Sequence, residues 1–163
     1  MQAAGPAGAQ RRDEAPDQEP SEAEVRLPAY PRADGLIEFQ PSGGARFRFF
    51  IDPASLALES GGEVRYTLVA RSPAGLDNVS YEGMRCAAGA YKVYAHGNDG
   101  RWAAGRQSGW RRIEPRTVQR WHNELHSNYF CPLGAPVLSA GEALDALRGG
   151  GHPAALRSTE RAY

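Results

Sequence analysis

Apolar and polar residues alternate along four stretches in the middle of this chain, a pattern typical of strands that bury one face. Turn segments containing Gly or Pro separate these stretches. Connections this short cannot carry a parallel strand back to the same edge of a sheet, so the sequence predicts an antiparallel meander. Extended segments near Trp102 and Trp110 bring the predicted sheet to four to six strands. The four main stretches are Arg46–Asp52, Glu63–Ser72, Asn78–Cys86 and Tyr91–Ala95.

After Pro115 the apolar spacing changes from that of a strand to that of a helix. Apolar residues recur every three or four positions and predict one stripe of a long amphipathic helix, which ends before Pro132. Ser139 and Glu142 form a capping pair that begins a second, short helix. The predicted fold class is α+β, an antiparallel β-meander with both helices packed on it. The stripe consists of Val118, Trp121, Leu125 and Tyr129.

The two ends of the chain differ in composition from its centre. Residues 1–26 are rich in Ala, Gly, Pro and acidic side chains and hold few apolar groups, so we expect a disordered leader. Residues 27–150 contain all the predicted strands and helices and form a single domain. Residues 151–163 follow a run of three glycines, and we expect them to be a flexible tail.

The chain contains two cysteines, Cys86 and Cys131, at the end of a predicted strand and of a predicted helix. We interpret them as one structural disulfide that joins the helix to the sheet, worth about 4 kcal/mol for a loop of this length. The alternative is two free, buried thiols. A disulfide favours an oxidising compartment. Because the N-terminus has no signal-peptide core, we expect an exported periplasmic or cell-envelope protein whose signal was removed, the alternative being a cytosolic one.

Charge and apolar content exclude some partners. The formal net charge is zero, with six acids and two arginines among residues 1–25 and an excess of positive charge in the remainder. That excess is too small to indicate nucleic-acid binding. No apolar run approaches the roughly 20 residues of a membrane-spanning helix, so we expect no membrane span.

The segment from Arg101 to Arg120 is the best candidate for a ligand surface. Arg and Trp are favoured in interfaces and suit stacked or anionic ligands, so we expect an envelope protein or an anionic glycan as partner. The alternative is that the tryptophans belong to the core and the arginines are solvated. The arginine–tryptophan surface consists of Trp110, Arg111, Arg112, Arg116 and Arg120.

His122 and His126 are the candidate metal ligands. Four positions apart on a helix, they share one face, a spacing that suits two ligands of one ion. Asn123 follows the first histidine where the metalloprotease signature has Glu, and a third ligand would have to come from elsewhere. The alternative is a structural or surface role. No nucleophile motif or phosphate-binding loop is present, so we expect no cofactor and favour a non-enzymatic protein.

Five segments of the predicted domain carry a resemblance when taken together: Phe49–Leu56, Val64–Val69, Asn78–Cys86, Tyr91–Tyr94 and Tyr129–Pro132. As a set they resemble the CNP-like family of uncharacterised proteins from Gram-negative bacteria, over about residues 27–150. The resemblance implies an exported, periplasmic protein and assigns no catalytic residues. A looser similarity, through Trp110, Ile113 and Pro115, is to the surface-adhesin-E-like exported domains, although the long predicted helix departs from their pattern.

These observations lead to two functional hypotheses. The first is an exported, non-enzymatic binding or accessory protein of the cell envelope that uses the arginine–tryptophan surface. The alternative is a metal-binding protein or metal-dependent enzyme that uses His122 and His126.

Overall fold

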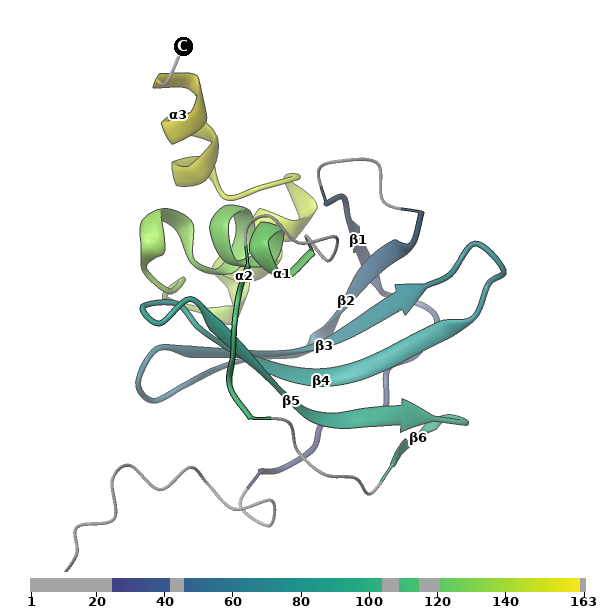
Figure 1. The fold of residues 1–163 in the computed structure, drawn as a ribbon. Coiled ribbons are helices and arrows are strands. Elements are labelled where there is room, and N and C mark those ends of the chain that lie inside the picture. Colours follow the sequence, from purple (N-terminus) through teal and green to yellow (C-terminus); the bar gives the residue numbers. More distant parts are fainter. Residues whose placement is uncertain (1–24, 42–45, 104–108, 115–120, 162–163) are drawn as a thin grey trace, which may run out of the picture.

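A single antiparallel sheet forms the framework of this computed structural model, which describes residues 25–41, 46–103, 109–114 and 121–161. In this part of the chain the strand order is β1-β2-β3-β4-β5-β6, and β7 also pairs with β5. All pairs are antiparallel, so the predicted meander is confirmed (Figure 1). The strands are β1 (Ile37–Phe39), β2 (Arg48–Glu59), β3 (Glu63–Arg71), β4 (Asp77–Arg85), β5 (Ala90–Asn98), β6 (Arg101–Ala103) and β7 (Arg111–Arg112).

Strand β2 continues past Asp52, where the sequence pattern predicted its end. The pairing register with β3 shifts between Asp52 and Ala57, so the intervening residues form a bulge. Ser55 holds this bulge closed: its hydroxyl donates to the Asp52 carbonyl at 2.7 Å and accepts the Thr67 N–H at 2.7 Å. A side chain therefore supplies hydrogen bonds that regular pairing would otherwise make, which lets the strand pass through Pro53.

The helical elements are shorter than predicted. α1 (Trp121–Glu124) continues directly into the π-helical segment η2 (Leu125–Phe130), followed by the 3₁₀ turn η3 (Pro132–Gly134). The expected long amphipathic helix is therefore not present in the described residues, and Val118 of its stripe lies outside them. The Cys131 N–H bonds to the His126 carbonyl five residues earlier, and the wider π winding buries both Tyr129 and Phe130.

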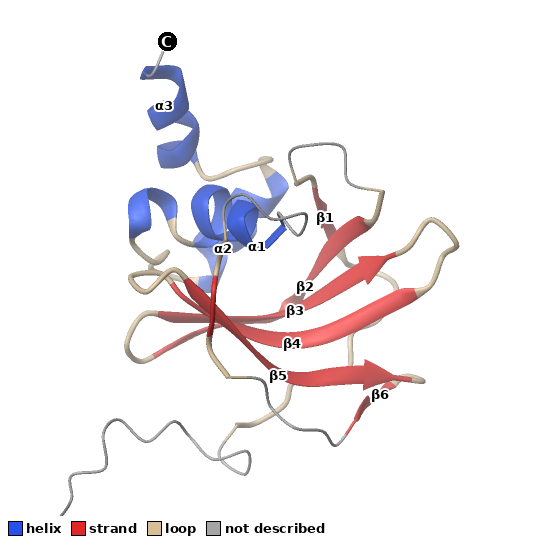
Figure 2. Ribbon diagram, viewed as in Figure 1, coloured by secondary structure: helices blue, strands red, loops and turns tan. Residues whose placement is uncertain are grey.

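Two further helices follow. α2 (Ala140–Arg148) begins as predicted at Ser139, whose hydroxyl accepts the Glu142 N–H at 3.1 Å. α3 (Pro153–Arg161) lies in the segment where the sequence led us to expect a flexible tail, and it extends away from the sheet (Figure 2). No helix in the described ranges is both long and apolar enough to cross a membrane.

The sheet has a helical face and a second face covered by the chain's early residues. On the helical face, Tyr66 and Met84 pack with Leu125 and Phe130 in the main core. The second face carries smaller clusters, including Tyr81 and Tyr94, against which the described N-terminal segment packs. Trp102 ties that segment down by donating its Nε1–H to the Pro28 carbonyl at 2.8 Å. Both faces of the sheet are therefore partly covered, by different parts of the chain.

Candidate functional site

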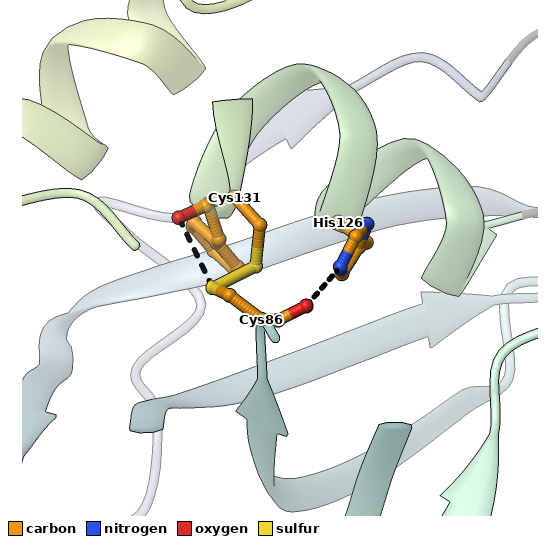
Figure 3. Close-up of a disulfide and its surroundings, with 4 residues drawn as sticks. Cys86, His126 and Cys131 are labelled. Carbon is orange, nitrogen blue, oxygen red and sulfur yellow. Dashed lines mark hydrogen bonds between the residues drawn. A yellow bond between two sulfur atoms is a disulfide. The ribbon is translucent and has the colours of Figure 1, made fainter. Parts of the chain in front are cut away.

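The predicted disulfide is present and links the sheet to the helical segment (Figure 3). Cys86 follows the last residue of β4, and Cys131 follows η2, with Cα atoms 5.3 Å apart. Both side chains are buried. His126 approaches the same place, its Nε2 lying 2.9 Å from the Cys86 carbonyl oxygen. The bond therefore joins two segments that are 45 residues apart in sequence and in contact in space.

The two candidate metal ligands are each engaged with a different partner. The Nε2 atom of His122 lies 2.6 Å from Glu82 Oε1, whereas that of His126 faces the Cys86 carbonyl. Cys131, a conceivable third ligand, is in the disulfide. Within the described ranges no group of three or more His, Cys, Asp or Glu side chains is placed to hold a metal ion. The structure thus provides no third ligand in these ranges for the metal hypothesis.

Glu82 is the centre of a buried polar network on the helical face. Its carboxylate also accepts hydrogen bonds from Tyr66 at 3.1 Å and Ser80 at 2.6 Å. The His122 ring stacks on Tyr91 with a centroid distance of 3.7 Å. Burial favours the neutral acid, but the charge and hydrogen bond of His122, with the other donors, outweigh it and lower the pKa of Glu82. The donors to the Glu82 carboxylate lie on β3, β4 and α1, so the carboxylate fastens α1 to the sheet.

A second buried carboxylate, Glu63, lies on the opposite face. Tyr94 donates its hydroxyl hydrogen to Glu63 at 2.5 Å, and Arg65 donates from Nε at 3.3 Å. Burial and then the bond to Glu63 raise the pKa of Tyr94. The carboxylate sits over Gly83, where an added Cβ would lie 2.1 Å from Glu63 Oε1. Only glycine therefore leaves room for this ion pair above β4.

The arginine–tryptophan surface divides between the two faces of the sheet. Arg111 pairs with Tyr91 and Arg112 with Ala90, so these adjacent, exposed arginines point to opposite faces. Trp110 is half-buried, and the guanidinium carbon of Arg85 lies 3.9 Å from the centre of its ring. Arg116 and Arg120 lie outside the described residues. The ligand-binding role of this surface stays a prediction.

Sequence reasoning missed Arg85, Glu63 and the network around Glu82. A signal for Glu82 existed: it shares its alternating face with Met84 and Cys86, so the pattern already placed a carboxylate on an apolar face. Arg85 meets Trp110 only because the two-residue strand β7 pairs with β5. The sequence predicted an extended segment near Trp110, but no local pattern indicated that it pairs with β5.

A protein-family model matches most of this chain. The model of the CNP1-like family matches residues 15–148, which is most of the chain and includes both cysteines, both buried carboxylates and Arg85. Neither the comparison with curated proteins nor that with solved structures found a match. The chain belongs to the CNP1-like family.

Proposed function

We propose that this protein is exported and acts in the periplasm or at the cell envelope as a non-enzymatic binding or accessory protein. The observation that carries the proposal is the buried Cys86–Cys131 disulfide. Disulfides form and persist in oxidising compartments and are rare in the reducing cytosol. Export accounts for both the disulfide and the resemblance to exported bacterial proteins.

A binding role fits how the buried ionisable groups are used. Glu82 accepts hydrogen bonds from two strands and α1, and Glu63 accepts them from Arg65 and Tyr94 within the sheet, so both hold the fold together. The exposed Arg112 and the half-buried Trp110, in contrast, lie at the β7 edge of the sheet, where Trp110 stacks with Arg85. This favours contact with a partner through Trp110 and Arg112, the part of the arginine–tryptophan surface that lies on the same face of the sheet as Arg85.

The compartment is tested by thiol alkylation of the native protein. Source cells are lysed directly into an alkylating reagent under denaturing conditions without reductant, and the intact mass is measured. We expect no alkyl adduct before reduction and two adducts after it. Two adducts in the unreduced sample would show that Cys86 and Cys131 are thiols in the cell, and the oxidising compartment would be refuted.

The binding role is tested by site-specific photo-crosslinking in the envelope fraction. A photoreactive residue replaces Arg112 in one variant and Arg148, exposed on α2, in the control variant. We expect one discrete crosslinked species with the first variant and none with the second. Crosslinks of equal yield and the same pattern at both positions would contradict a specific partner at the β7 edge.

A further inference from the structure

The pairing of three strands places two arginines on either side of a small residue. Ala90 of β5 pairs with Arg85 of β4 on one side and with Arg112 of β7 on the other. Directly paired residues in antiparallel strands share a face, so both arginines point to the face away from α1. Two strand spacings separate their backbones by about 10 Å. Ala90, the residue between them in this row, carries only a methyl group.

Arg85 is held in place before any ligand arrives. Its guanidinium lies over the Trp110 indole at 3.9 Å, within the range of a favourable cation–π contact. Glu63 of β3 pairs with Arg85 on the side away from Ala90, and its carboxylate already accepts hydrogen bonds from Tyr94 and Arg65. In the described part of the chain neither Arg85 nor Arg112 makes an ion pair, and both are exposed. Their charge is therefore available to an anion from outside.

We propose that Arg85 and Arg112 form a two-arginine clamp that binds the acid groups of an anionic glycan. This inference rests on the proposed binding function and identifies the chemistry of its partner. The guanidinium is a flat fork that matches a carboxylate with two parallel hydrogen bonds, and stacking on an aromatic ring fixes its plane. Two such forks, carried on strands whose backbones lie about 10 Å apart, suit a polymer that carries several acid groups.

Affinity for oligogalacturonate, which carries a carboxylate on every sugar, tests the clamp directly. The variants Arg85→Gln and Arg112→Gln are compared with Arg111→Gln, which removes the same charge from the neighbouring residue on the opposite face. Because each clamp variant removes a charge-assisted hydrogen-bond donor, we expect each to weaken binding about tenfold or more. Arg111→Gln should change binding less than about twofold, because only long-range, salt-screened attraction is lost.

A second pair of variants tests the gap between the arginines. Ala90→Glu places a carboxylate between them and should abolish binding, whereas Ala90→Ser should preserve it. Thermal unfolding of each variant shows whether the fold is retained. If Ala90→Glu unfolds, the arginine series alone decides.

Three ligands and the variant comparison separate the outcomes. An uncharged galacto-oligosaccharide should not bind, whereas dextran sulfate, whose sulfates also accept paired guanidinium hydrogen bonds, should bind and lose affinity in the same two clamp variants. If Arg111→Gln and Arg112→Gln weakened binding equally, the arginines would act only by long-range electrostatic attraction, and the clamp would be overturned. Failure of the unmodified protein to bind oligogalacturonate would also overturn it, while the alkylation result would still stand as the test of the compartment.

Discussion

At the scale of single residues, two carboxylates organise the two faces of the sheet in different ways. Glu82 is satisfied by donors from β3, β4 and α1, so it connects layers of the fold. Glu63 is satisfied by Arg65 and Tyr94 within the sheet and needs the space above Gly83. Each of the two is buried at a cost that its hydrogen bonds must offset, which makes both sensitive to small changes.

Replacing Gly83 by alanine should destabilise the protein by about 1–3 kcal/mol. The new Cβ would lie 2.1 Å from Glu63 Oε1 and 2.9 Å from Tyr94 Cε2, so the carboxylate and the ring must both move. Urea unfolding of the variant measures the loss. The matched control is Gly109→Ala, because among the described residues, its chain neighbours aside, no atom lies within 4 Å of a Cβ built there. Equal unfolding midpoints for the two variants would show that the site tolerates the added methyl group.

Glu82→Gln should lower stability near neutral pH by about 2 kcal/mol, since it removes the charge that His122 meets. Because the folded-state pKa of Glu82 lies below its ordinary value of 4.5, its contribution is present above that pH and is lost as pH falls below it. Urea unfolding between pH 3 and pH 7 should therefore show that the free energy of unfolding falls more steeply with decreasing pH in the unmodified protein than in the variant. The difference between the two slopes should correspond to about one bound proton. Parallel pH profiles would show that Glu82 does not carry this linkage.

At the scale of elements, the strands could be predicted from the sequence and the helical segment could not. Residues of β3 and β4 alternate between the two faces of the sheet, and this period of two stays the same whichever face is packed. The segment after Trp121 was predicted from a period of 3.6, but π winding in η2 brings Phe130 into the core beside Tyr129. Pairing of β7 with β5, which creates the gap between Arg85 and Arg112, depends on contacts that no local pattern encodes.

His152 shows a further element-scale feature, the N-terminal cap of α3. Its Nδ1 accepts the Ala154 N–H at 3.0 Å, and its Nε2 lies 2.8 Å from Glu142 Oε1. Acceptance at Nδ1 requires that atom to be unprotonated, so Nε2 carries the hydrogen and donates it to Glu142. One imidazole thus caps α3 and ties it to α2.

His152→Ala should free the start of α3 at a cost of about 1 kcal/mol, whereas His152→Asn should retain the cap and lose only the contact with Glu142. Hydrogen exchange of the α3 amides measures the effect. We expect faster exchange in the alanine variant and intermediate exchange in the asparagine variant, with the sheet amides unchanged. Identical exchange in all three proteins would mean that α3 does not depend on His152.

At the scale of the whole molecule, the helical segment is fastened to the sheet at two separate points. The disulfide joins the end of β4 to the end of η2, and the Glu82–His122 pair joins the middle of β4 to α1. One fastening depends on redox conditions and the other on pH. Because they act on the same two layers of the fold at different points, loss of one should leave the other to hold the segment.

Replacing both cysteines by serine should lower the free energy of unfolding by about 2–4 kcal/mol, because the unfolded chain regains the freedom that the cross-link removes. Urea unfolding of the double variant, beside the unmodified protein with and without reductant, measures this. Adding Glu82→Gln to the double variant should lower the free energy of unfolding by more than the sum of the two separate losses. The helical segment then has neither the disulfide nor the ion pair, and the two act on the same contacting layers. Strict additivity would show that the disulfide and the ion pair hold the molecule independently, and that α1 and η2 do not dock on the sheet as one unit.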